Sequence, residues 1–148
     1  MSLNPDFQAS LFQDIAPARA MQLSIMEYAD GRLEISAPLE PSINDKGTAF
    51  AGSISSLLVL AGWGLVTLRL REAGIRAEVV VSRNETVYKR PIRSEMHAHA
   101  EAGTAKFDQL ITDLTGNGRG NIRIHANLLS QEKLCATMTA TYVAAVVP

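Results

Sequence analysis

An uncharged stretch near the middle of the chain constrains its fold more than any other feature. After Lys46 no charged side chain occurs until Arg69. A stretch of this kind either crosses a membrane or forms a helix that is buried on every side in a protein core. A membrane span needs about 20 predominantly apolar residues, whereas only residues 57–66 are free of hydroxyl side chains. We therefore predict a buried central helix over residues 50–73 and no membrane partner.

The composition fits one globular domain, residues 1–148, with a genuine hydrophobic core. Of the 148 residues, 47% are hydrophobic and 20% are charged, a balance that excludes a disordered chain. The formal net charge of -1 provides no overall positive field for a phosphate backbone, so we predict no nucleic-acid partner. Cys135 is the single cysteine, and the first residues lack the basic and apolar segments of a signal peptide. We therefore predict a cytoplasmic protein.

Periodic segments on both sides of the central helix predict strands. Residues 18–28 and 32–39 flank the dipeptide Asp30-Gly31, which is typical of the tight turn in an antiparallel hairpin. Further strands are predicted over residues 76–91, 94–102, 121–130 and 133–147, and further helices over residues 5–15 and 104–114. This order of elements predicts an α+β fold in which one antiparallel sheet curls around the central helix.

Two glycines, Gly62 and Gly64, lie inside the predicted central helix. Each costs up to about 1 kcal/mol relative to alanine in a helix interior. We therefore expect the sheet or a partner subunit to approach the helix backbone closely at these positions. Because one sheet cannot cover a helix on all sides, we also expect a second copy of the chain to supply the missing cover.

Four motifs together resemble those of a known family: "PSINDKGTAFAGS" at residues 41–53, "LAGWGL" at 60–65, "VYKRP" at 87–91 and "GRGNIRI" at 118–124. The chain resembles the hotdog-fold acyl-thioester proteins, and most closely the thioesterase family of the YiiD-type C-terminal domain. The resemblance implies a curved antiparallel sheet wrapped around a long central helix, assembled as a dimer or a dimer of dimers. It also implies hydrolysis of acyl-CoA or acyl-carrier-protein thioesters at a dimer interface. No separate cofactor is implied, because coenzyme A or phosphopantetheine is part of the substrate.

The start of the central helix supplies candidate groups for binding the thioester carbonyl. Free N–H groups at a helix start form a partly positive donor pair, and a glycine at position 52 would let a substrate oxygen approach the main chain. Gly52 and Ser53 could equally serve as plain helix caps. The resulting candidates are Ala51 and Gly52 for carbonyl binding, Ser53 for catalysis and Phe50 for substrate binding.

The group that would activate the attacking water is not obvious. Many hotdog thioesterases carry an acidic residue about two turns into this helix. That position falls near Val59 here, and residues 47–68 contain no carboxylate. In the preceding loop, Asn44 could orient water or bind the carbonyl, and Asp45 could act as a base, although both are also ordinary turn residues. The loop candidates are therefore Asn44 and Asp45 for catalysis, and Lys46 and Thr48 for substrate binding.

Tyr88 and several arginines complete the candidate site. Strand alternation would place Tyr88 and Arg90 on one face. There the tyrosine hydroxyl could donate to a carbonyl or simply form part of a wall. Arginine matches phosphate in charge and geometry. Candidates for the coenzyme A phosphates are Arg90, Arg93, Arg119 and Arg123, with Arg90 and Arg119 taken as substrate-binding residues.

The three histidines and the cysteine give weaker signals. His97 and His99 share one face of a predicted strand and could both reach a zinc ion. A third ligand is missing at any clear spacing, with His125 the remaining option. We therefore predict no metal site, and one of these histidines could instead be the base. Cys135 is predicted to be a small buried packing residue.

Two classes of function remain. The first is a thioesterase whose acyl chain lies in a hydrophobic tunnel along Leu57, Leu58, Ala61 and Leu65. The second is a non-catalytic acyl-thioester binding or sensor protein of the same fold, which the missing carboxylate favours. A dehydratase on this fold is a weaker third option, because its usual histidine and acid pair is not visible.

Overall fold

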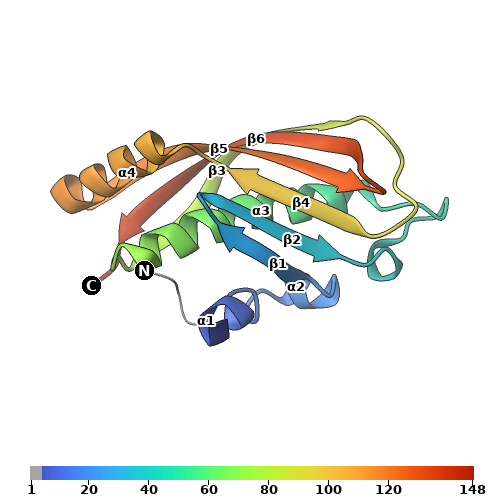
Figure 1. The fold of residues 1–148 in the computed structure, drawn as a ribbon, viewed down its shortest axis with the longest axis horizontal. Coiled ribbons are helices and arrows are strands. Elements are labelled where there is room, and N and C mark those ends of the chain that lie inside the picture. Colours follow the sequence, from blue (N-terminus) through green and yellow to red (C-terminus); the bar gives the residue numbers. More distant parts are fainter. Residues whose placement is uncertain (1–4) are drawn as a thin grey trace.

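A computed structural model describes residues 5–148 as one antiparallel sheet that curls around a long helix (Figure 1). The strand order across the sheet is β1-β2-β4-β5-β6-β3. This is the α+β arrangement that the order of the predicted elements indicates. The helices are α1 (Pro5–Ser10), α2 (Ala16–Ala20), α3 (Ala51–Glu72) and α4 (Thr104–Asn117), and the strands are β1 (Ser24–Ala29), β2 (Arg32–Ala37), β3 (Ala77–Tyr88), β4 (Met96–Glu101), β5 (Arg119–Ser130) and β6 (Lys133–Val146).

Two tight turns fix the register of the hairpins. Asp30 and Gly31 join β1 to β2 with φ angles of 53° and 72°, as the two-residue turn that matches the twist of a hairpin requires. Gln131 and Glu132 join β5 to β6 with φ angles of 52° and 64°, a conformation that residues other than glycine rarely adopt. Both turns lie where the sequence predicts them.

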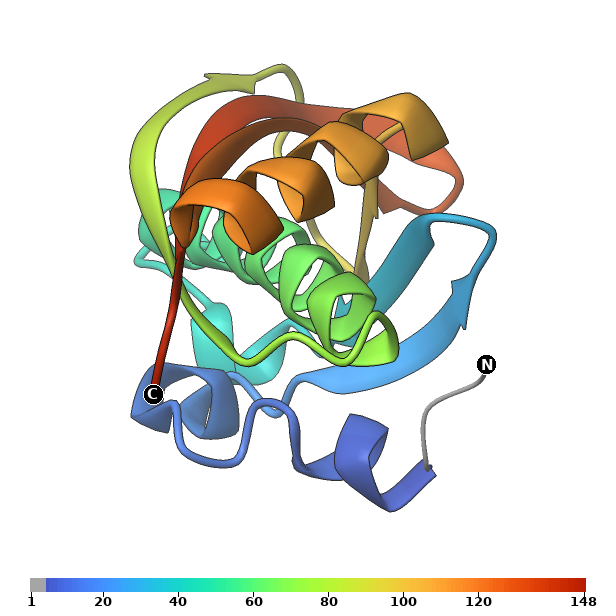
Figure 2. The same cartoon turned by 90° about the vertical axis from the view of Figure 1, so that its left-hand side faces the viewer.

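α3 is the core helix of the fold. Its 22 residues run inside the curve of the sheet, as Figure 2 shows, and contact five strands, β2 to β6. Its bounds agree with the predicted helix to within one residue at each end, and Gly74, with a φ of 75°, follows it. Among residues 5–148, α3 alone is long and apolar enough to cross a membrane, but 61% of that apolar window is buried inside the molecule.

The two glycines in α3 allow close approach by neighbouring side chains. A Cβ at position 62 would overlap the hydroxyl of Tyr142, and one at position 64 would lie 2.8 Å from Leu33 Cδ2 and 2.9 Å from Phe12 Cζ. Tyr142 is held in place because its hydroxyl donates to the Val59 carbonyl at 2.7 Å. The predicted close approach is therefore confirmed, with the sheet and the N-terminal segment as the neighbours.

α4 packs against the concave face of the sheet, beside the C-terminal end of α3 (Figure 2). Phe107, Leu110 and Leu114 recur at helical spacing and are buried, and α4 contacts β5. The Arg69 guanidinium of α3 lies over the ring of Phe107, 4.8 Å from its centre. The helix predicted over residues 104–114 is confirmed and extends to Asn117.

The N-terminal region differs from the prediction. The leading helix ends at Ser10, and residues 16–20 form α2, although the predicted strand began at residue 18. Pro17 occupies the first turn of α2, where the fixed φ of proline favours a helix. Ala18 and Met21 are both buried in the core cluster, so their spacing is that of a short helix.

One side of α3 and the neighbouring edge of the sheet lack cover within residues 5–148. Gly52, Ser56, Val59 and Trp63 recur at helical spacing and are only half-buried. β3 lies at the edge of the sheet, pairs with β6 alone and has mostly exposed side chains. The two features are adjacent, because Trp63 Nε1 donates to the carbonyl of Val79 at 3.0 Å.

Candidate active site at the start of α3

The loop before α3 is held together by the side chain of Asn44. Its Oδ1 accepts hydrogen bonds from the backbone N–H of Lys46 at 2.8 Å and of Thr48 at 3.1 Å. Its Nδ2 donates to Thr48 Oγ1 at 2.9 Å and to the Ala49 carbonyl at 3.3 Å. Because both ends of the amide are occupied, Asn44 shapes the loop that leads into the helix.

The first turn of α3 presents two backbone N–H groups without an acceptor. Phe50 is the N-cap residue and makes no side-chain capping bond. Its carbonyl accepts from the N–H groups of Ser53 and Ile54 at 3.0 and 3.1 Å, and no residue of 5–148 accepts from the N–H groups of Ala51 and Gly52. This donor pair and the positive end of the helix dipole form a site for a polarised or negatively charged oxygen.

The ring of Phe50 lies over this turn. A Cβ at position 52 would overlap the ring and lie 2.9 Å from its Cζ. The space that we expected a substrate oxygen to use is therefore filled by the ring in this structure. The side chain is 56% exposed, so the ring can move away without disturbing the core.

Tyr88 and Ser53 are brought to the same turn from different parts of the chain. The Tyr88 hydroxyl donates to the carbonyl of Ala51 at 3.3 Å, because β3 pairs with β6 up to Tyr88 and ends beside the start of α3. The half-buried hydroxyl of Ser53 has no hydrogen-bond partner among the described residues. These two hydroxyls and the Ala51–Gly52 donor pair form the helix mouth, the candidate active site.

The charged residues of the loop lie outside the helix mouth. Lys46 Nζ and Asp45 Oδ1 are 3.0 Å apart, and their side chains are 76% and 83% exposed. Thr48, by contrast, is buried and its hydroxyl accepts from Asn44. The structure therefore brings Phe50, Ala51, Gly52, Ser53 and Tyr88 together and leaves Asp45 paired with Lys46 at the surface.

The expected acyl tunnel is not found where the sequence placed it. Leu57, Leu58, Ala61 and Leu65 are all fully buried core side chains with 0% exposure. A hollow of about 480 Å³ lies farther along the uncovered side of α3, and its lining includes Trp63, Thr67, Val79, Leu11 and Ile15. The Thr67 hydroxyl is buried there without a hydrogen-bond partner. No sequence pattern indicated this hollow, because it joins α3 to β3 and to the N-terminal segment.

The four candidate arginines fall into two separate groups. The backbone N–H groups of Lys89 and Arg90 both donate to the Cys135 carbonyl, so strand alternation ends at Tyr88 and does not place Arg90 on its face, as we had expected. Arg90 and Arg93 line one hollow of about 230 Å³. Arg119 and Arg123 lie at the other end of β5, opposite Ala145 and Thr141 of β6.

The histidines lie on the convex face of the sheet, away from α3. His97 and His99 each place Nδ1 3.4 Å from an oxygen of Glu34, a neighbour on β2 that the sequence did not reveal. His125 Nδ1 is 3.1 Å from Thr139 Oγ1. In residues 5–148, no group of three potential ligands is placed to hold a metal ion. The sheet separates these histidines from the helix mouth.

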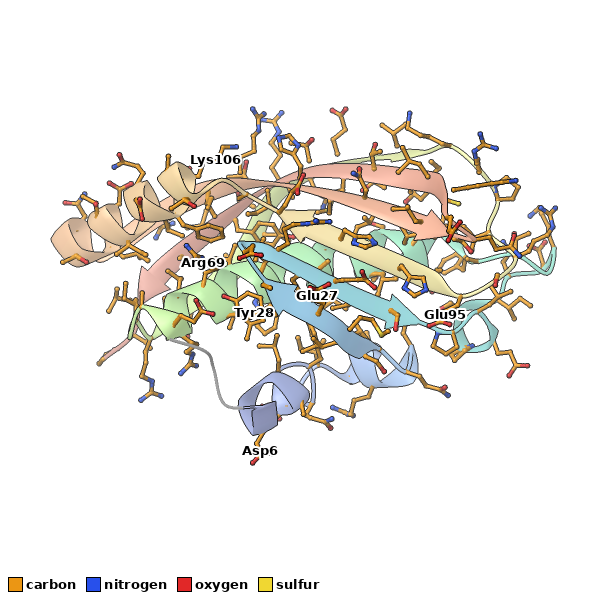
Figure 3. All side chains as sticks on the ribbon, viewed as in Figure 1. Asp6, Glu27, Tyr28, Arg69, Glu95 and Lys106 are labelled. Atoms are coloured by element: carbon orange, nitrogen blue, oxygen red, sulfur yellow. The ribbon has the colours of Figure 1, made fainter. Side chains whose placement is uncertain are left out.

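A buried tyrosine, Tyr142, and a half-buried one, Tyr28, have pKa values above the usual range. Burial raises the pKa of Tyr142, and burial together with Glu72 raises the pKa of Tyr28. Figure 3 shows Tyr28 beside Arg69, near the C-terminal end of α3 and far from the helix mouth. Neither hydroxyl therefore belongs to the candidate site.

Comparisons with known proteins agree with this architecture. A family model described as "Putative thioesterase (yiiD_Cterm)" matches residues 5–146. A protein of unknown function from Chlorobaculum tepidum is 28% identical, with 97% of this chain and 98% of that chain covered and a TM-score of 0.88. A putative thioesterase from Shewanella oneidensis is 26% identical over 97% and 96% of the two chains, with a TM-score of 0.80. A thioesterase from Haemophilus influenzae, 17% identical over 99% and 93% of the chains with a TM-score of 0.77, is similar in fold.

Proposed function

Because this chain belongs to the family described as putative thioesterases and has the hotdog fold, we propose that it hydrolyses acyl thioesters of coenzyme A or acyl carrier protein in the cytoplasm. The observation that carries the proposal is the uncapped first turn of α3. There the N–H groups of Ala51 and Gly52 have no acceptor among residues 5–148, and they can bind a thioester carbonyl when the exposed ring of Phe50 moves aside.

The proposed reaction begins when the thioester carbonyl oxygen accepts hydrogen bonds from these two N–H groups. Water attacks the carbonyl carbon, and the donors stabilise the negative charge that develops on the oxygen. The carbon–sulfur bond then breaks, and the leaving thiolate takes up the proton that the water released. The products are a carboxylic acid and a free thiol.

The remaining candidates take supporting roles in this proposal. The hydroxyls of Ser53 and Tyr88 orient the attacking water, since both lie in the helix mouth. Asn44 is a positioning residue, because its amide holds the loop that leads into α3. Asp45 is the candidate base, and it must leave its ion pair with Lys46 to reach the water.

A second copy of the chain completes the proposed site. An unpaired sheet edge such as β3 is a surface to which another strand can add. Antiparallel pairing of two β3 strands would place the end of one, at Tyr88, beside the first residues of the other, Ala77 to Val79. The helix mouth of one subunit would then face the 480 Å³ hollow of its partner, which we propose receives the acyl chain.

Replacing Ala51 by proline tests the donor pair directly. Ala51 is the first residue of α3, and Phe50 before it is extended, with φ and ψ of -64° and 134°. Proline is favoured at the first helical position and accepts an extended residue before it, so the fold should tolerate the change while one N–H is lost. We expect kcat for acyl-CoA hydrolysis to fall about 100-fold or more, measured as free-thiol release.

Ala51→Ser is the matched control, because it keeps the N–H group and should retain most of the activity. If Ala51→Pro and Ala51→Ser turn over acyl-CoA at the same rate, the donor pair is not the carbonyl site.

A non-catalytic acyl-thioester sensor is the second candidate. The pairing of Asp45 with Lys46 favours it, since this leaves the helix mouth without a free carboxylate. A panel of acyl-CoA substrates separates the two functions. Tight binding without thiol release across the panel would identify a sensor, whereas release by the wild-type protein identifies the thioesterase.

A further inference from the structure

Three cationic side chains converge on a hollow at the end of the sheet where the helix mouth opens. Arg90 and Arg93 come from the connection between β3 and β4, and Lys133 is the first residue of β6. All three are exposed and line the same hollow of about 230 Å³. Lys133 was not among the residues that the sequence singled out.

No carboxylate of residues 5–148 forms an ion pair with any of these three cations, although other surface cations are paired. Arg32 pairs with Glu101, and Arg69 pairs with Glu72. Glu95, which is next to the hollow in the sequence, is 3.9 Å from His97 Nε2 instead. Three unpaired cations around one hollow suit a phosphate group, which guanidinium binds through paired hydrogen bonds.

The backbone connects this hollow to the helix mouth. The carbonyl of Ile92, which also lines the hollow, accepts from the N–H of Ala49 at 2.9 Å, and Ala49 directly precedes the N-cap residue Phe50. Figure 3 shows Glu95 at this end of the molecule and Lys106 towards the other end. A ligand with its phosphate in the hollow would therefore have its other end near the helix mouth.

We propose that Arg90, Arg93 and Lys133 bind the phosphate of a phosphopantetheine arm whose thioester lies in the helix mouth. This inference rests on the proposed function, because it assigns the part of the site that recognises the acyl carrier. The phosphate is common to coenzyme A and to acyl carrier protein. Arg119 and Arg123 do not take part in the same subunit, because they lie at the opposite end of β5.

Binding of two probes that differ by one phosphate tests the proposal without requiring turnover. By titration calorimetry, we expect the wild-type protein to bind 4′-phosphopantetheine about tenfold or more tightly than pantetheine, about 1.4 kcal/mol. The triple variant Arg90→Gln, Arg93→Gln, Lys133→Gln should lose this difference. Lys106→Gln, on an exposed lysine of α4 that does not line the hollow, should keep it. Equal affinity for the two probes in the wild type, or a difference that survives the triple variant, overturns the proposal.

A competition arm identifies the source of the phosphate. If adenosine 3′,5′-bisphosphate displaces 4′-phosphopantetheine from the wild type but not from the triple variant, the hollow also holds the nucleotide phosphates of coenzyme A. If the bisphosphate does not compete while the phosphate dependence remains, the pantetheine phosphate alone is recognised, as in a carrier protein.

Kinetics separate failure of this inference from failure of the proposed function. The ratio of kcat/KM for acyl-CoA to that for acyl-pantetheine should fall about tenfold in the triple variant and remain unchanged in Lys106→Gln. Hydrolysis with an unchanged ratio in the triple variant would overturn the phosphate site and leave the thioesterase standing. Phosphate-dependent binding without any thiol release would leave the phosphate site standing and refute the hydrolase.

Discussion

At the scale of single residues, Phe50 links the fold to the proposed chemistry. Its ring is 56% exposed and lies over Gly52 at the helix mouth. We expect Phe50→Ala to raise KM for acyl thioesters about tenfold, because an apolar ring beside the thioester contributes about 1.5 kcal/mol or more to binding. Stability should change by less than about 0.5 kcal/mol, as is usual for surface positions. Thiol-release kinetics and a thermal melt measure the two effects.

Met26→Ala is the control for Phe50→Ala. Met26 is 53% exposed on β1, at the other edge of the sheet, so its loss should leave KM unchanged. An unchanged KM in both variants would remove Phe50 from the substrate site.

The raised pKa of Tyr142 predicts how the stability of the protein depends on pH. Burial raises the pKa of its hydroxyl above the usual range. The folded protein therefore keeps this proton at pH values where the unfolded chain has lost it. The resulting stabilisation is complete below about pH 10 and decreases as the pH rises above that value, by up to about 1.4 kcal/mol per pH unit.

Denaturant unfolding at a series of pH values from 8 to above 11 measures this slope. Tyr28 contributes with the same sign, since its pKa is also raised. Tyr142→Phe should be less stable at pH 8, because it loses the bond to the Val59 carbonyl, and should lose less stability than the wild type above pH 10. Identical slopes for the two proteins would contradict the assignment.

At the scale of secondary-structure elements, local patterns predicted most of the fold. The bounds of α3 follow from an apolar run that ends in a charged turn and a glycine, and the β1–β2 turn follows from the dipeptide Asp30-Gly31. α2 was missed because its five residues are too few to show a helical period. The structure of such a short segment depends on its packing against the core, and this packing cannot be read from the local sequence pattern.

Gly62 tests how closely α3 packs against the sheet. A methyl group there would overlap the hydroxyl of Tyr142, which its bond to Val59 prevents from moving freely. We expect Gly62→Ala to destabilise the protein by about 1 to 3 kcal/mol, the usual cost of overpacking, despite the better helix propensity of alanine. Thermal unfolding should show a lower Tm.

Gly116→Ala is the matched control, because Gly116 lies in α4 and nothing surrounds its Cβ position within 4 Å. Here propensity acts alone, so Tm should rise slightly. A higher Tm in both variants would show that the Tyr142 side chain can shift at little energetic cost.

At the scale of the whole molecule, the candidate site shows why its residues could be predicted only in part. Ala51, Gly52 and Ser53 are adjacent in the sequence, so the predicted start of one helix sufficed to place them together. Tyr88 and Lys133 reach the same end of the molecule only through the register of β3 with β6. Strand register depends on pairing between segments that are distant in the chain, so it cannot be read directly from one sequence. The four arginines that are candidates for the coenzyme A phosphates lie in two separate groups for the same reason.

The same register leaves both edges of the sheet open, but the two edges differ. β1 spans 6 residues and β3 spans 12, and each has one register shift against its neighbour, between Ile25 and Glu27 and between Val81 and Arg83. Very short edge strands pair poorly with other strands, whereas a long exposed edge offers more backbone groups for pairing. The uncovered side of α3 lies next to β3. We therefore expect the chain to dimerise through β3, as the proposed shared site requires.

Substituting lysine for two valines on β3 tests this assembly. Val80 and Val87 are 58% and 45% exposed on the edge strand, and charged side chains on an edge oppose the addition of another strand. In sedimentation at micromolar concentration, we expect a dimer or a dimer of dimers for the wild type and a shift towards monomer for Val80→Lys, Val87→Lys. Thiol release should fall together with the dimer, because the helix mouth loses the partner's hollow. Met26→Lys on β1 adds the same charge at the other edge and should alter neither property. A wild-type monomer, or a monomeric variant with full activity, would show that one chain contains the whole site.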